Sequence, residues 1–146
     1  MALTKDLVLA KCKTDNLKLL KKLNLWGVGF EDVSILTQMP NVEVLALSIN
    51  KISTLRDFQN CQNLQELYLR RNNIRNLAEI KYLKGLPYLH TLWLNENPCA
   101  DHPNYRSFVI SQLPDLRKLD NLEITDSERS KAMSSGAMAD DYSSKP

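Results

Sequence analysis

A cysteine and a histidine three positions apart come nearest, by type and spacing, to a catalytic or metal site in this chain. Asp101 lies between Cys99 and His102, and His90 lies upstream. Cysteine and histidine bind zinc and can act as nucleophile and base, but a structural zinc site takes about four protein ligands and a catalytic one about three. No second ligand pair lies nearby, and the glycines are scattered rather than gathered in a phosphate-binding loop. We therefore expect no enzyme, no metal and no cofactor.

Aromatic and basic residues offer a second kind of chemistry, the binding of another protein. Tyrosine, tryptophan and arginine dominate the hot spots of protein interfaces. The candidates in this chain are Trp26, Tyr68, Arg70, Arg71, His90 and Trp93. Whether they share a surface depends on the elements that carry them.

Four copies of one spacing, Leu-x-x-Leu-x-Leu-x-x-Asn-x-Ile, determine those elements. They begin at Leu20, Val42, Leu64 and Leu89, at offsets of 22, 22 and 25 residues. This pattern at a period of about 20 to 29 residues is the leucine-rich-repeat signature. The sequence therefore predicts an α/β fold, a leucine-rich-repeat solenoid with short parallel strands on the concave face, 3₁₀ or α turns on the convex face, and a cap at each end.

Each copy holds two leucines two positions apart, such as Leu45 and Leu47, whose side chains point to the same face of a short strand. The ninth position carries Asn50, Asn72 and Asn97 in three copies, whereas the first copy has Val28 there. A buried asparagine amide can satisfy the turning backbone of neighbouring coils. We expect these three asparagines to form a structural ladder.

After each asparagine the apolar residues recur at every third position, for example at Ile52, Leu55 and Phe58. This period suits 3₁₀ turns better than an α-helix. The third copy is three residues longer than the others. Residues 78–85 are therefore predicted to form a true α-helix.

The N-terminal cap is predicted over residues 1–19. Thr4 is placed to begin a helix that ends near Cys12, with Ala10 among the residues of its inner face. Several lysines lie in and just after this segment. They form either a solvated end or a weak site for an acidic partner, and the sequence leaves both readings open.

The repeats are expected to fill residues 20–115, and a C-terminal cap residues 116–133. Thr125 and Glu128 match a capping box for a last short helix. Residues 134–146 have too little apolar content to fold alone. They are predicted to be a disordered tail or linker.

Side chains that alternate away from the core should form the open concave face. Tyr68 and Trp93 then share a column on adjacent strands about 4.8 Å apart, with Arg70 one step along its strand. The two rings either bind a partner or only shield the face of the sheet. The second reading is possible because cross-strand aromatic pairs stabilise sheets by about 0.2 to 1 kcal/mol without a partner. Three nearby glutamates interrupt the positive field of the arginines. We therefore expect a protein partner rather than nucleic acid.

The composition agrees with this assignment. A formal net charge of +2 is too near neutral to indicate a nucleic-acid binder. No apolar run approaches the length of a membrane span, which is about 20 residues, so we expect no membrane insertion. The sequence contains no motif of a small-molecule pocket, so we also expect no small-molecule substrate. Cys61 and Cys99 occupy apolar repeat positions, which suits free thiols in a reducing compartment and points to the cytoplasm.

Four runs of residues carry a resemblance to a known family. They are Leu45 to Leu55, Glu66 to Ile74 (Glu-Leu-Tyr-Leu-Arg-Arg-Asn-Asn-Ile), Tyr82 to Pro87, and Leu92 to Cys99 (Leu-Trp-Leu-Asn-Glu-Asn-Pro-Cys). With them the chain resembles the cilia- and flagella-associated leucine-rich-repeat proteins over about residues 1 to 133. The resemblance implies a cytoplasmic and ciliary scaffold near the basal body that acts in cilium or flagellum assembly, with a NIMA-related kinase among its partners. It also implies oligomerisation through a C-terminal region that is absent from this sequence.

The same repeat type occurs in two other kinds of protein. One is an assembly factor of a ribonucleoprotein, which clasps an RNA-recognition domain, and the other is a regulator of a protein phosphatase. An RNA-linked role would give binding that falls steeply with salt. Both remain alternatives to a ciliary scaffold.

Overall fold

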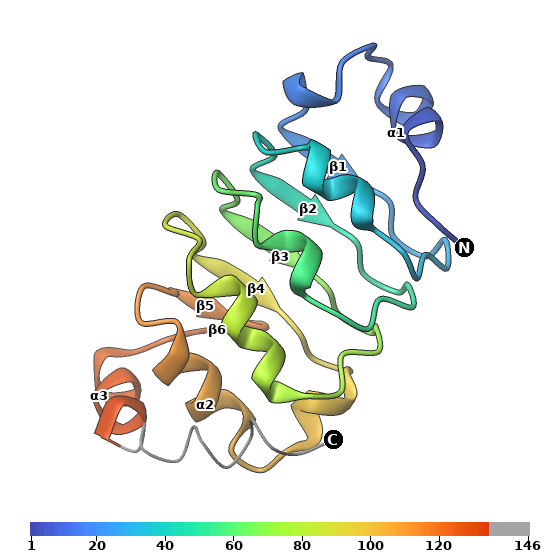
Figure 1. The fold of residues 1–146 in the computed structure, drawn as a ribbon. Coiled ribbons are helices and arrows are strands. Elements are labelled where there is room, and N and C mark those ends of the chain that lie inside the picture. The colour runs from blue at the N-terminus through green and yellow to red at the C-terminus, as the bar shows by residue number, and fades with distance from the viewer. Residues whose placement is uncertain (135–146) are drawn as a thin grey trace.

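The core of the fold is a sheet that grows by one short strand with each repeat. The computed structural model describes residues 1–134, and six strands among them form one sheet in sequence order (Figure 1). Their bounds are Lys22–Asn24 (β1), Val44–Ala46 (β2), Glu66–Tyr68 (β3), Thr91–Trp93 (β4), Lys118–Leu119 (β5) and Leu122–Glu123 (β6). The first five pair in parallel, and β6 turns back antiparallel on β5. The predicted leucine-rich-repeat solenoid is confirmed.

The repeat leucines build the core because they fall in register from strand to strand. Leu23, Leu45, Leu67 and Leu92 pair in turn across β1 to β4, and each is at most 1% exposed. Successive strand residues point to opposite faces. The residues between the leucines are therefore directed to the open face, where a partner could reach them.

The convex side consists of 3₁₀ helices. Their bounds are Leu17–Leu19, Ser34–Gln38, Arg56–Phe58, Leu77–Leu83 and Pro98–Asp101. The α-helix predicted over residues 78–85 is wrong, because the segment is the 3₁₀ helix Leu77–Leu83. Leu77, Ile80 and Leu83 are all buried, and a helix with three residues per turn keeps side chains at this spacing on one face. The extra residues lengthen the 3₁₀ helix without changing its type.

A short helix, α1 (Lys5–Cys12), closes the first end of the ladder (Figure 1). Thr4 Oγ1 accepts a hydrogen bond from the Leu7 N–H at 3.2 Å, so the predicted N-cap is confirmed. The inner face differs from the expectation, since Val8 is fully buried and Ala10 is exposed. Ala10 is two residues beyond Val8, which places it about 200° around the helix and toward solvent.

Two helices, α2 (Tyr105–Gln112) and α3 (Asp126–Ser134), close the other end. Thr125 Oγ1 accepts from the Glu128 N–H at 3.1 Å, as a capping box requires. The Glu128 carboxylate, however, binds the guanidinium of Arg106 on α2. Arg106 also donates to the Leu119 carbonyl oxygen at 3.0 Å, so one side chain joins both helices to β5. Apart from Ser134, the predicted tail lies outside the described residues.

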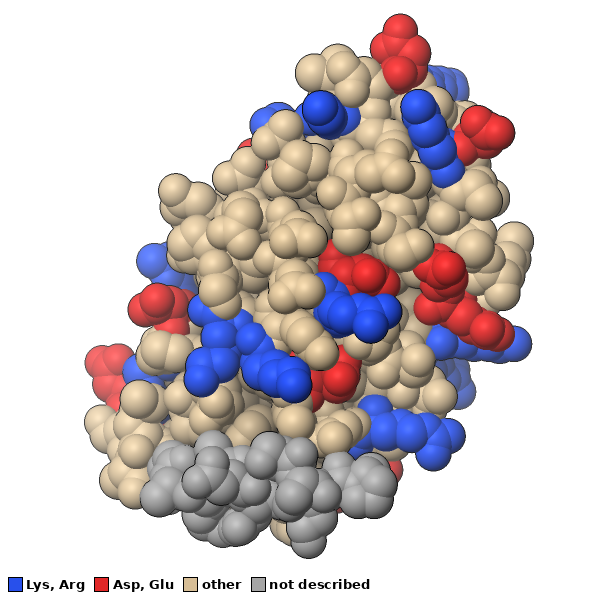
Figure 2. All heavy atoms as spheres, viewed as in Figure 1, with Lys and Arg blue, Asp and Glu red and all other residues tan. Residues whose placement is uncertain are grey.

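The surface seen in Figure 2 carries basic and acidic side chains in alternation, without a large block of one sign. Over residues 1–134, no helix has the length and apolar content needed to cross a membrane. Recognition by charge therefore depends on how individual side chains are paired.

Candidate protein-binding surface

Tyr68 and Trp93 meet on the open face of the sheet. They lie in register on β3 and β4, with ring centroids 5.8 Å apart and ring planes inclined by 60°. This edge-to-face geometry is favourable by about 0.5 to 1.5 kcal/mol beyond the area that it buries. Both side chains remain partly exposed, so the pair presents a rigid aromatic surface.

Two carboxylates bind polar atoms of Tyr68 and Arg70, whereas Trp93 Nε1 is buried without a hydrogen-bond partner among the described residues. The Tyr68 hydroxyl donates to the Glu66 carboxylate. Burial and the neighbouring Glu66 raise the pKa of Tyr68 to about 12, so the hydroxyl stays protonated at neutral pH. Arg70 Nε lies 2.7 Å from a carboxylate oxygen of Glu96. The structure thus brings Tyr68, Arg70 and Trp93 together in one cluster.

Trp26 lies on the same side of the sheet but apart from that cluster. It follows β1 and is 61% exposed. Strand β2 lies between β1 and β3, about two strand spacings or about 10 Å. The open-face side chains of β2 and its end are all small: Val44, Ala46 and Ser48. Trp26 is therefore a separate contact point, two strands from the aromatic pair.

Arg71 occupies the turn that follows β3. The equivalent turn residues all have left-handed backbone, with φ of 73° at Gly27, 57° at Ile49, 60° at Arg71 and 62° at Glu96. Arg71 is exposed and makes no side-chain ion pair or hydrogen bond among residues 1–134. Ile49 is the unusual member, because a β-branched residue seldom adopts this conformation, which costs about 1 to 2 kcal/mol.

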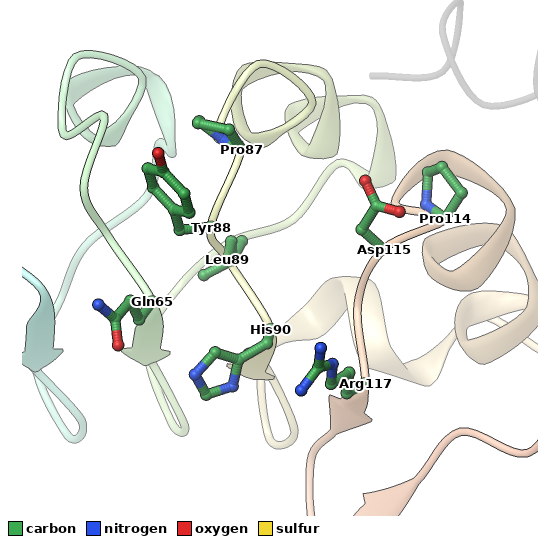
Figure 3. A pocket seen from close by; sticks show the side chains of 8 residues that line it. All are labelled: Gln65, Pro87, Tyr88, Leu89, His90, Pro114, Asp115 and Arg117. Atoms are coloured by element: carbon green, nitrogen blue, oxygen red, sulfur yellow. The ribbon is translucent and has the colours of Figure 1, made fainter.

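His90 lies in a groove at the edge where the strands begin, away from the aromatic pair (Figure 3). The groove has a volume of about 580 Å³ and receives residues from three successive coils. His90 Nδ1 is 2.8 Å from Thr91 Oγ1. Gln65 and Arg117 flank His90 in neighbouring coils, since the His90 N–H donates to the Gln65 carbonyl and the Arg117 N–H to the His90 carbonyl.

Three asparagines tie neighbouring coils together where the strands end: Asn50, Asn72 and Asn97. Asn72 Nδ2 donates to the carbonyl oxygens of Leu47 and Leu69, both at 3.1 Å, and Oδ1 accepts from the Ile52 N–H at 3.0 Å. Asn72 is 9% exposed, so water has little access to these backbone groups. The bonds to Leu47 and Ile52 reach the preceding coil and fix the stacking of the two repeats.

Cys99 is unsuited to nucleophilic chemistry. It is 3% exposed, and burial, together with Asp120, raises the pKa of its thiol to about 12. The thiol is therefore protonated at neutral pH and is not a nucleophile. His102 Nδ1 accepts the Asn104 N–H at 3.0 Å. In the described part of the chain, no group of three or more His, Cys, Asp or Glu residues could hold a metal ion.

Asp120 ends the ladder, a role that the sequence analysis missed. Its Oδ1 accepts the N–H groups of Leu94 at 2.8 Å and Asn95 at 3.0 Å, and the Tyr105 hydroxyl donates to Oδ2 at 3.1 Å. The carboxylate thus satisfies the backbone at the end of β4. The available signal was the Leu119-Asp120 pair after the last repeat spacing.

Comparison with known proteins supports the same fold and relates the chain to named proteins. A leucine-rich-repeat family model matches residues 27–140. The chain is 51% identical over 138 residues to cilia- and flagella-associated protein 410 of Homo sapiens, covering 93% of this chain and 54% of that protein. It is 35% identical over 104 residues to U2 small nuclear ribonucleoprotein A′ of Neurospora crassa, covering 70% of this chain and 41% of that protein.

Among solved structures, the chain is similar to a crystal structure of the Drosophila melanogaster SNF/U2A′ complex. The TM-score is 0.76 at 24% identity, over 94% of this chain and 79% of the other. The chain spans 54% and 55% of the human and Mus musculus forms of cilia- and flagella-associated protein 410. The resemblance expected from the sequence is confirmed, and the chain belongs to the leucine-rich-repeat family.

Proposed function

We propose that this chain is a non-enzymatic module that binds a protein partner on the concave face of its sheet. The observation that supports this most directly is the partly exposed cluster of Tyr68, Arg70 and Trp93 on and just after β3 and β4. These residue types dominate binding hot spots. A strand scaffold fixed on both sides leaves their side chains little freedom to lose on binding, so their contact area contributes at low entropic cost.

The partner surface extends from this cluster to Trp26, Arg71 and His90. Each of the three lies at a border of the concave face, with Trp26 on the side of the first repeat and His90 at the edge where the strands begin. Trp26 is the largest exposed apolar side chain among them. Partner contacts at these positions would span four neighbouring coils.

The biological setting we propose is cilium or flagellum assembly, in the cytoplasm near the basal body. The 51% identity to cilia- and flagella-associated protein 410 supports the ciliary part of this proposal. We propose a NIMA-related kinase as one partner, and self-association through a C-terminal region outside this sequence. Both suggestions rest on the family resemblance.

The test separates binding from stability, because the aromatic pair also stabilises the sheet. The Tyr68→Ala/Trp93→Ala double variant and the parent are compared by thermal melting, by capture from ciliated-cell extract and by direct binding of a purified NIMA-related kinase. We expect the variant to melt within a few degrees of the parent and to lose its main partner. Tyr82→Ala, which removes a half-buried ring from the convex side, is the matched control. If the double variant folds and binds every partner as before, the Tyr68–Trp93 pair only covers the sheet and does not bind the partner.

Similarity to U2 small nuclear ribonucleoprotein A′ favours a second candidate, an assembly role in a ribonucleoprotein. Its partner would be an RNA-recognition domain, and the captured complex would contain RNA. Nuclease treatment distinguishes the two candidates. A captured protein with an RNA-recognition domain, together with RNA that nuclease removes from the complex, supports the ribonucleoprotein role. Capture of a partner without such a domain and without RNA supports the ciliary scaffold.

A further inference from the structure

The charged side chains at the concave face differ in whether they have a partner within the chain. Four carboxylates at this face interact with a group of the chain itself: Glu43, Glu66, Glu96 and Asp120. Glu123, which pairs in register with Lys118, makes no side-chain ion pair or hydrogen bond among residues 1–134. Asp120 is the most fully engaged, since it accepts two backbone N–H groups and the Tyr105 hydroxyl. Glu43 and Glu96 are thus paired with the cations Lys21 and Arg70. Glu66 and Asp120 accept hydrogen bonds from neutral groups and keep their charge.

Four cations of the same face have no such partner. Among residues 1–134, no ion pair or side-chain hydrogen bond involves Lys22, Arg71, Arg117 or Lys118. Arg117 and Lys118 lie at the start of β5, next to the groove that contains His90. Arg117 and Lys118 are therefore cations at the start of β5 without an internal side-chain partner among the described residues, and Arg117 lines the groove itself.

The groove shows where this charge meets a defined shape. Figure 3 shows the side chains of Gln65, His90 and Arg117 in a row along its lower side, with the Arg117 guanidinium turned toward the His90 ring. Tyr88 stands above the row on one side and is 60% exposed. Asp115 lies on the opposite side, away from Tyr88 and Gln65.

We propose that this groove binds an acidic, extended segment of a protein partner. The assignment rests on the proposed protein-binding function and adds the place and the chemistry of one contact. A carboxylate of the segment is bound by the Arg117 guanidinium and by Nε2 of His90, whose Nδ1 already contacts Thr91. The exposed Tyr88 ring packs against the apolar part of the same segment.

Charge spacing favours an acidic peptide over a nucleic acid. Asp115 lies in the groove itself, and Glu43 precedes the neighbouring strand. A phosphate at every nucleotide would bring some phosphates close to these carboxylates, whereas a peptide can carry its acidic residues two or three positions apart and avoid them. The groove therefore suits intermittent negative charge.

The test uses three fluorescein-labelled peptides of twelve residues that differ at four positions, spaced evenly among serine, proline and leucine. The four positions carry glutamate, glutamine or lysine. We expect the parent protein to bind the glutamate peptide best, with affinity falling as salt is added. Backbone and side-chain NMR signals of Tyr88, His90 and Arg117 should shift on addition of this peptide. Equal binding of the glutamine peptide would overturn the proposal.

Variants locate the contact. Arg117→Gln should weaken binding of the glutamate peptide by about two- to fivefold, the range of an exposed ion pair. Arg75→Gln, at an exposed arginine in the loop after β3, is the matched control and should leave binding unchanged. Arg117→Glu should shift preference toward the lysine peptide. Because the Arg117 side chain makes no internal bond among the described residues, each variant is expected to melt with the parent.

Two further probes test other polyanions. The probes are a twelve-nucleotide oligouridylate and vesicles that contain phosphatidylserine. If either binds more strongly than the glutamate peptide, the ligand of the groove is a nucleic acid or a membrane, and the proposal of an acidic protein segment is wrong. If Tyr68→Ala/Trp93→Ala abolishes partner capture while Arg117→Gln leaves peptide affinity unchanged, the groove assignment fails and the proposed function stands. If peptide binding depends on Arg117 but the Tyr68→Ala/Trp93→Ala variant keeps every partner, the groove assignment stands and the proposed function of the aromatic cluster fails.

Discussion

Replacing Asn72 by alanine should destabilise the fold more than any conservative change on its surface. The side chain makes three hydrogen bonds to backbone groups, two through Nδ2 and one through Oδ1. Each is worth about 1 kcal/mol net, and the groups left behind are buried, so Asn72→Ala should lower the free energy of unfolding by about 3 kcal/mol. For a chain of 146 residues the entropy of unfolding is about 0.3 kcal/mol/K. The melting temperature should therefore fall by about 10 °C.

The assay is thermal and urea unfolding of Asn72→Ala beside a matched control. Asn73 is the adjacent asparagine, and its side chain makes no hydrogen bond among the described residues, whereas its backbone N–H donates to the Ile52 carbonyl in any variant. Asn73→Ala should stay within about 0.5 kcal/mol of the parent. Amide exchange gives a second measurement, because the Ile52 N–H loses its acceptor in Asn72→Ala.

Equal melting temperatures of Asn72→Ala and Asn73→Ala would refute this reasoning. They would mean that water or a shifted backbone satisfies Leu47, Leu69 and Ile52 without the amide. A selective loss at Asn72 would instead show that the ladder, and not apolar burial alone, fixes how the repeats stack.

Three other variants or conditions follow from the same structure. Ile49→Asn should raise the free energy of unfolding by about 0.5 to 1 kcal/mol, since asparagine tolerates the left-handed backbone; a lower melting temperature would show that Ile49 contributes packing that outweighs its strain. The hydrogen bond from Arg106 holds the pKa of Glu128 below its ordinary value of 4.5, so the ion pair stabilises the fold above that pH. The free energy of unfolding of the parent, measured by urea titration, should therefore fall as the pH drops below about 4.5. The decrease over the same pH range should be smaller in Arg106→Gln. A thiol reagent at neutral pH should modify only Cys12 in the folded protein and all three cysteines after denaturation; rapid reaction of the two buried thiols would contradict their burial.

The repeat period let the sequence predict the ladder and its core. Apolar residues at every third position after the asparagines, such as Ile52, Leu55 and Phe58, are all fully buried. The same period predicted where the strands lie and that Tyr68 and Trp93 share a column. This works because each coil contacts only its neighbours, so a local pattern repeated in register is enough to define the stack.

The three-residue apolar period predicted 3₁₀ turns correctly, but the greater length of the third copy led to the wrong prediction of an α-helix there, and the turn geometry had no signal in the sequence. The segment Leu77–Leu83 contains good helix formers and is long enough for α-helix, yet contacts with the neighbouring coils hold it to three residues per turn. Ile49 adopts a left-handed conformation that its own preferences oppose. In both cases, packing against adjacent repeats outweighs the local propensity of the residues.

The sequence by itself determined the fold, and the aromatic and basic residues of the candidate surface could be identified from it. Only the tertiary structure decided which of those residues meet, because Trp26 is separated from Tyr68 by the small side chains of β2. It also decided which charged side chains have an internal partner, since Glu66 and Glu96 are bonded within the chain while the Arg117 side chain has no partner among the described residues. The physical reason is that pairing depends on distances of a few ångströms between side chains from different coils, which the spacing along the sequence does not specify.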